Sequence, residues 1–146
     1  MSADPVERLP QTGPARLVVE AVEVEEERTV CLARVPRASG LRSLAPAPGL
    51  LPLSVVIEIA AQAAATAEPA QAEGATGSGP RLLVGVRGVR FLVDSLDANA
   101  TFRVVTTRTT HAPPFRSYAF ELFHDDQPVA SGELSTFFDS EGTGAD

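Results

Sequence analysis

The sequence has a single cysteine, no tryptophan and no lysine, so all twelve of its basic residues are arginines. One cysteine cannot form a disulfide within the chain, and stability must therefore come from a packed core. We expect the cysteine, Cys31, to be a small buried residue of that core. With 146 residues, 44% of them apolar, the chain is long enough to build such a core as one domain.

Positive charge is also scarce, because twelve basic residues stand against nineteen acidic ones and the net charge is −7. Nucleic acids and anionic membranes attract proteins through a positive field, so this balance argues against both as main partners. The chain begins without the basic and apolar segments of a signal peptide. No apolar run reaches the roughly 20 residues that cross a bilayer. We expect a cytoplasmic protein.

Valine-rich and aromatic runs predict most of the secondary structure as strands. Short turns between the later strands favour antiparallel neighbours. We expect a flexible N-terminus at 1–8, one domain at 9–138, and a disordered acidic tail at 139–146, with a Gly- and Ser-rich loop at 68–80. The predicted strands cover 16–25, 28–36, 82–93, 100–110, 116–124 and 128–138.

One segment, 50–67, predicts a helix that is apolar around most of its circumference. Such a helix belongs inside a protein. Its polar residues follow one i, i+4 row, made of Ser54, Glu58, Gln62 and Thr66. Two strands, one buried helix and a run of further strands predict an α+β protein with an antiparallel sheet wrapped around one long central helix, the hotdog fold. A single sheet with a single helix leaves apolar surface, so we expect a homodimer or a heterodimer with a second hotdog protein.

The helix sequence LPLSVVIEIAAQAAA at 51–65 resembles the helix of hotdog-fold 3-hydroxyacyl-acyl-carrier-protein dehydratases, the FabA/FabZ-like group. There, a Pro-Gly turn precedes a helix with the pattern Glu-Ala-x-Ala-Gln-Ala. Leu9-Pro10-Gln11 looks like the family's Leu-Pro-His start. Residues 85–91 and 125–133 are similar to its third strand and final hairpin, so the resemblance covers about 9–138.

The resemblance implies dehydration of a 3-hydroxyacyl thioester in fatty-acid or polyketide-type biosynthesis. The substrate would be carried on the phosphopantetheine of an acyl carrier protein or on CoA, and no cofactor is expected. In this family the catalytic site lies between protomers, with a carboxylic acid and a histidine from different chains. Glu58 takes the position of the acid, and Gln62 is the candidate to hydrogen-bond Glu58 or a water.

This chain departs from the family pattern at the histidine. The loop 40–49 before the helix contains none, and Gln11 replaces the histidine of the Leu-Pro-His start. A glutamine amide accepts no proton at useful pH. One hypothesis is that this chain contributes Glu58 to a mixed dimer whose partner contributes the histidine. Two alternatives stay open: a hotdog thioesterase in which Glu58 directs water, and a non-catalytic acyl-binding or scaffolding subunit.

The remaining predictions concern substrate contacts. The backbone N–H groups of Gly49, Leu50 and Leu51, at the expected helix start, are candidates to polarise the thioester carbonyl. Arg87 and Arg90 are candidates to meet the acidic face or the phosphate of a carrier protein. No spacing of Cys, His and acidic residues predicts a metal site. The candidate lining of an acyl tunnel is Leu53, Val56, Ile57, Val89 and Phe91.

Overall fold

The computed structural model describes residues 6, 13–25, 27–66, 81–112 and 114–138, without the side chains of 14, 81–84, 110, 111 and 138. The predicted loop 68–80 and tail 139–146 lie outside the described residues. The predicted flexible segment 1–8 also lies outside them, apart from Val6, whose side chain is buried in the core.

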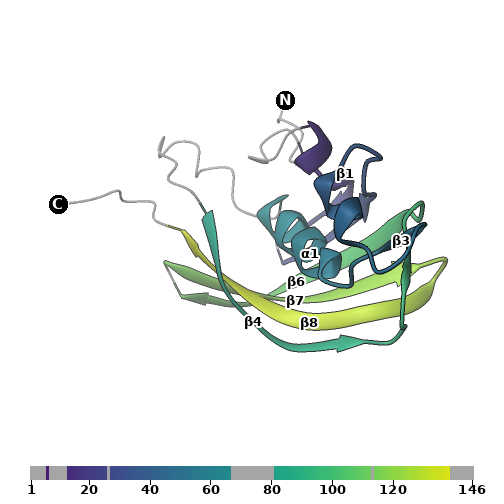
Figure 1. The fold of residues 1–146 in the computed structure, drawn as a ribbon. Helices are drawn as coiled ribbons and strands as arrows, with labels where there is room; N and C mark the ends of the chain where they lie inside the picture. Colours follow the sequence, from purple (N-terminus) through teal and green to yellow (C-terminus); the bar gives the residue numbers. More distant parts are fainter. Residues whose placement is uncertain (1–5, 7–12, 26, 67–80, 113, 139–146) are drawn as a thin grey trace.

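Six strands form one antiparallel sheet in the order β1-β2-β6-β7-β8-β4 (Figure 1). Each strand predicted from the sequence is present, with bounds that differ by a few residues. The next long strand after β4 in the sequence is β6, but β4 pairs with β8 instead. As a result, β1 and β4 occupy the two edges of the sheet. The strands are β1 Val18–Val24, β2 Arg28–Ala33, β4 Arg81–Phe91, β6 Phe102–Ala112, β7 Phe115–His124 and β8 Gln127–Phe138.

The sheet has one face toward the core and one toward solvent, as the alternation in β7 shows. Tyr118, Phe120 and Leu122 of this strand are buried, whereas Phe115 and Glu121 are exposed. The turn between β7 and β8 contains Asp125 and Asp126, both with positive φ, 52° and 64°. Consecutive positive φ values fit a two-residue hairpin turn whose twist matches that of the strands.

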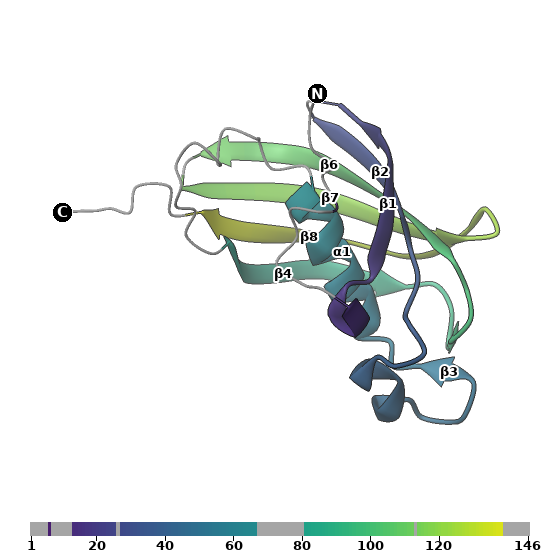
Figure 2. The same ribbon diagram turned by 90° about the horizontal axis from the view of Figure 1, so that it is seen from above.

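The α-helix found among the described residues, α1 Val55–Thr66, lies in the concave face of this curved sheet (Figures 1 and 2). It contacts β1, β2, β6 and β7, with fewer contacts to the edge strand β4. Most of its side chains are buried, as expected for a helix that is apolar around most of its circumference. This is the predicted antiparallel sheet wrapped around a central helix. No helix among the described residues is long and apolar enough to span a membrane.

The start of the helix was predicted wrongly. Residues expected in its first turn form a short strand instead, β3 Leu50–Leu51, which pairs with β5 Leu96–Asp97 in the connection between β4 and β6. Pro52 gives the reason, because the ring of a proline disfavours helical backbone at the residue before it. The helix therefore begins at Val55, whose N–H donates to the carbonyl of Pro52 at 3.0 Å.

The predicted loop between β2 and β3 contains a 3-10 helix, η3 Gly40–Leu44. The Arg42 guanidinium of η3 donates hydrogen bonds to three carbonyl oxygens: those of Val35 at 2.7 Å, Pro36 at 3.0 Å and Ala98 at 2.8 Å. These bonds join the loop to the connection between β5 and β6. The loop that precedes α1 is thus held in one place by an arginine.

Candidate functional site

Glu58 is the single charged residue of α1. It lies on the side of the helix where the side chains are only half-buried, together with Ile57, Ala61 and Ala65. The other side of the helix is packed against the sheet and the core. Glu58 therefore borders the part of the helix that the protein's own sheet does not cover.

Gln62, one turn after Glu58, is only 1% exposed, and its amide makes four hydrogen bonds. Its Oε1 accepts from the backbone N–H groups of Leu17 at 2.7 Å and Val18 at 3.3 Å. Its Nε2 donates to the carbonyl of Ala15 at 2.9 Å and to Oε2 of Glu58 at 3.1 Å. The amide thus joins α1 to the residues from η2 (Gly13–Ala15) to the start of β1. The predicted contact between Gln62 and Glu58 is present.

Among the described side chains, no histidine pairs with Glu58. His124 ends β7, where its ring centroid lies 5.7 Å from that of Phe102 and its Nε2 is 3.6 Å from a carboxylate oxygen of Asp125. The side chain of His111 lies outside the described residues. Among the described residues, the hydrogen bond from Gln62 is the one side-chain polar contact that Glu58 makes. A base for α-proton removal is therefore not brought to Glu58 by these residues.

The residues predicted as backbone oxyanion donors lie before the helix. The N–H of Leu50 donates to the carbonyl of Ala47 at 3.2 Å, and the carbonyl of Gly49 accepts from Ala98 at 2.9 Å. The prediction assumed that these N–H groups lie at the positive end of the helix dipole. Leu50 and Leu51 instead belong to β3, and the helix begins only at Val55, so the dipole does not support that role. Their role toward a thioester stays a prediction without that support.

The predicted acyl-lining residues fall into different environments. Val56 is fully buried in the core. Leu53, Ile57 and Val89 are partly buried and pack against it, whereas Phe91 is 40% exposed at the end of β4. Ile57 shares the open side of α1 with Glu58, whereas Leu53 lies in the turn before the helix. Of the five, Ile57 is therefore the best placed to meet an acyl chain that reaches the carboxylate.

Arg87 and Arg90 lie on the same outer face of the sheet although they are three positions apart. In a regular strand this spacing would place them on opposite faces. The register shifts between them, where Gly88 has φ +64°, so that Arg87 pairs with Glu133 and Arg90 with Ser131. A bulge at a glycine explains the shift. Arg87 and Arg90 are both exposed to solvent.

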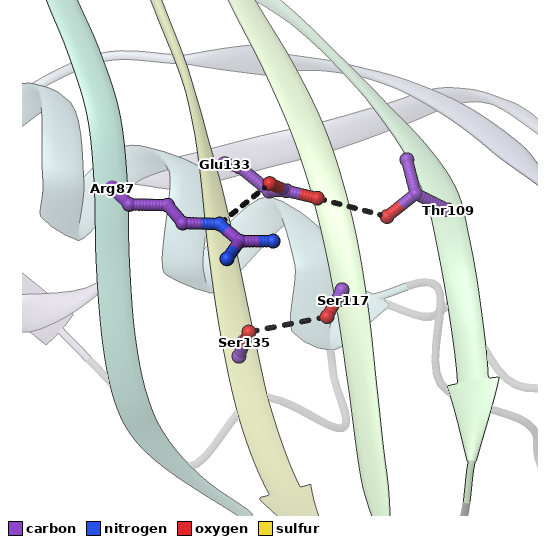
Figure 3. Close-up of polar contacts among 5 residues, drawn as sticks. All are labelled: Arg87, Thr109, Ser117, Glu133 and Ser135. Carbon is purple, nitrogen blue, oxygen red and sulfur yellow. Dashed lines mark hydrogen bonds and ion pairs between the residues drawn. The ribbon is translucent and has the colours of Figure 1, made fainter.

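A polar network on the outer face includes one of these arginines (Figure 3). Nε of Arg87 lies 2.9 Å from Oε1 of Glu133, whose Oε2 accepts from the Thr109 hydroxyl at 3.2 Å. Ser117 and Ser135 are hydrogen-bonded beside them at 3.1 Å. The sequence did not predict that Glu133 and Thr109 would be the partners of Arg87. These residues come together only through the register of β4, β6 and β8 in the sheet.

Cys31 is buried, as predicted, with its Sγ 3.5 Å from the hydroxyl of Thr66. Burial raises the pKa of the Cys31 thiol, and the hydrogen bond with Thr66 opposes this only in part. Among the described residues, no group of three His, Cys, Asp or Glu side chains is placed to hold a metal ion.

A family model described as ApeP dehydratase, ApeP-like, matches residues 3–143 of the chain. A comparison with curated proteins finds no significant match. Solved structures are similar in fold. The chain is similar to the dehydratase heterocomplex ApeI:P from Xenorhabdus doucetiae, with a TM-score of 0.79, 21% identity, and coverage of 94% of this chain and 92% of that one.

Two further solved structures have the same fold at lower similarity. One is the TT0310 protein from Thermus thermophilus, with a TM-score of 0.59, 16% identity and coverage of 83% and 92% of the two chains. The other is a hypothetical thioesterase with coenzyme A from Streptococcus pneumoniae, with a TM-score of 0.59, 7% identity and coverage of 85% and 88%. Both likenesses support the hotdog fold alone.

Proposed function

The chain belongs to the ApeP-like dehydratase family, and from this premise we propose that it acts on 3-hydroxyacyl thioesters as one subunit of a two-chain dehydratase. Glu58 of this chain and a histidine of the partner would form the site between the subunits. The observation that carries the proposal is the position of Glu58, a single carboxylate on the open side of an otherwise uncharged helix, held by a buried glutamine.

The reaction divides the proton transfers between the two chains. The partner's imidazole takes a proton from Cα of the substrate, and the electron pair of that C–H bond becomes the new Cα–Cβ double bond. The Cβ–O bond breaks as protonated Glu58 gives its proton to the departing hydroxyl. The products are a 2-enoyl thioester and water. The proton on the imidazolium then returns to Glu58 through solvent, which restores both groups.

The part of the protein that a partner would cover is the β4 edge together with the open side of α1. β4 is an edge strand of eleven residues, and Val86, Phe91 and Leu92 on or beside it are exposed. Long edge strands with apolar side chains favour pairing with another chain. The structurally similar ApeI:P is a heterocomplex, which supports a second hotdog protein, different in sequence, as the partner.

The substrate would arrive on an acyl carrier protein in fatty-acid or polyketide-type synthesis. Carrier proteins offer a phosphodiester and acidic side chains, which arginine binds well through charge-assisted hydrogen bonds. Arg87 and Arg90, brought to one face by the bulge at Gly88, offer such a surface on an otherwise acidic chain. A CoA thioester is the alternative carrier, and the cytoplasm is the compartment we propose.

The proposal is tested by comparing this chain alone, a histidine-bearing hotdog protein from the same cell alone, and the two co-expressed. The probe is a 2-butenoyl thioester of N-acetylcysteamine, with hydration and release of free thiol followed separately. We expect hydration by the co-purified pair at a rate at least tenfold above either chain. Equal hydration by this chain alone would contradict the two-chain site. Thiol release without hydration would favour a thioesterase, and an inactive pair would favour a scaffolding subunit.

A further inference from the structure

The four hydrogen bonds of Gln62 fix the orientation of its amide, that is, which positions the oxygen and the nitrogen take. An amide side chain offers two N–H donors and an oxygen with two acceptor positions. All four are used, because the oxygen accepts from Leu17 and Val18 while the nitrogen donates to Ala15 and Glu58. The side chain is 1% exposed, so no water competes for these groups.

The backbone makes this orientation the only workable one. Turning the amide by 180° would set its N–H groups against the N–H groups of Leu17 and Val18. It would also set its oxygen against the carbonyl of Ala15. Buried polar groups left without a partner are costly, because they have lost their hydrogen bonds to water and gain none in the protein. The group that faces Glu58 is therefore an N–H donor, fixed by strand-entry residues more than forty positions away in the sequence.

The N–H group that donates to Oε2 of Glu58 restricts where this oxygen can hold a proton. As long as the bond of 3.1 Å is made, Oε2 is an acceptor and carries no proton toward Gln62. The other oxygen, Oε1, has no polar partner among the described residues. Glu58 lies on the half-buried side of α1, so Oε1 is the oxygen free to meet a substrate.

We infer that Gln62 is a positioning residue and that Glu58 exchanges its proton with the substrate through one oxygen, Oε1. This inference rests on the proposed function for the substrate, but the orientation itself does not. Gln62 touches no substrate in this arrangement. It holds the carboxylate against rotation, so that the geometry for proton transfer is set before the substrate binds.

Nuclear magnetic resonance tests the orientation without any activity. In the ¹⁵N-labelled chain, we expect two well-separated side-chain amide protons of Gln62 that exchange slowly with water. Glu58→Ala should shift one of them and speed its exchange, while the backbone amides of Leu17 and Val18 keep their positions. No change at the Gln62 side chain in Glu58→Ala would overturn the inference. Because Glu58 is half-buried, this variant is expected to fold.

Kinetics of the two-chain complex test the consequence. Gln62→Met keeps the size of the side chain and removes its hydrogen bonds, and should lower kcat by about tenfold or more with KM changed less than threefold. Thr66→Val, one turn further along the same buried row, is the matched control because its hydroxyl bonds to Ala63 and Cys31 and not to Glu58.

The outcomes separate the two ideas. Loss of activity in Glu58→Gln with an unchanged kcat in Gln62→Met would overturn the positioning role and leave the proposed function standing. Full activity in Glu58→Gln would overturn the proposed function, while the resonance experiment would still decide how Gln62 lies. An equal loss of kcat in Gln62→Met and Thr66→Val would assign the effect to stability and overturn the positioning role.

Discussion

Nε of Arg87 donates a hydrogen bond to Oε1 of Glu133 at 2.9 Å, joining the edge strand β4 to β8 on the outer face of the sheet. The Thr109 hydroxyl donates to the second oxygen of the same carboxylate at 3.2 Å. Both bonds favour the ionised form. The hydrogen bond from Arg87, followed by that from Thr109, holds the pKa of Glu133 below its ordinary value.

Removing the arginine should raise that pKa. In Arg87→Gln we expect the pKa of Glu133 to rise toward the ordinary glutamate value, and in Thr109→Val to rise by less. A carboxylate with a lowered pKa in the folded state adds stability above its unfolded pKa, and this is lost as pH falls through the folded pKa. Carboxyl ¹³C chemical shifts followed against pH give the midpoint. The same midpoint in Arg87→Gln and the parent chain would contradict this.

Reversing both outer arginines should weaken carrier-protein binding. For Arg87→Glu with Arg90→Glu we expect at least a tenfold weaker Kd for a phosphopantetheinylated acyl carrier protein at low salt, and a smaller difference at high salt because charges are screened. Arg28→Glu is the control, since Arg28 pairs with Glu23 near the opposite edge of the sheet. Binding is measured by calorimetry, and an equal loss in Arg28→Glu would reject a specific arginine surface.

Gly132 is required by its neighbours on the concave face. A Cβ at this position would lie 2.9 Å from Cζ of Phe120 and 3.0 Å from a methyl group of Val89. Because Phe120 is only 1% exposed, its ring has little room to move. We expect Gly132→Ala to lower the free energy of unfolding by about 1–3 kcal/mol.

A second strand glycine provides the comparison for that substitution. A Cβ at Gly85 would meet nothing within 4 Å, so Gly85→Ala should change the free energy of unfolding by less than about 0.5 kcal/mol. Urea denaturation of both variants measures the difference. Equal effects at the two positions would show that contact with Phe120 and Val89 does not decide the cost.

The thiol of Cys31 should be inert in the folded protein. Its pKa is raised by burial, and the thiolate is the reactive form. We expect alkylation by iodoacetamide at neutral pH to proceed only as fast as the protein opens, and to reach the rate of a free cysteine in denaturant. Mass spectrometry follows the modification over time. Rapid labelling under native conditions would place Cys31 outside the core.

The sheet and the helix were predictable because their signals are local and repetitive. Alternating valines and aromatics give the strands, and the uncharged run around Glu58 gives the helix. The pairing of β3 with β5 involves only Leu50–Leu51 and Leu96–Asp97, which is too short for any periodicity. Pro52 restricts the residue before it to extended backbone, which favours the short strand over a first helical turn at Leu50–Leu51.

The candidate site was predictable in its residues and not in its bonds. The i, i+4 spacing placed Glu58 beside Gln62. The contacts of Gln62 with Leu17 and Val18 depend on how β1 enters the sheet, and no sequence pattern encodes that register. The same holds for Arg87 and Arg90. Their shared face depends on a bulge, and the positive φ of Gly88 is visible only in the structure.

The proton-carrying role of Glu58 is tested most directly by the single-turnover rate of the two-chain complex carrying Glu58→Gln, measured with a saturating 3-hydroxyacyl thioester. The amide keeps the size of the side chain but exchanges no proton at useful pH. We predict a rate at least about a hundredfold below that of the parent complex, because general acid catalysis contributes about 10²–10⁴-fold. A rate within threefold of the parent complex would contradict a catalytic Glu58.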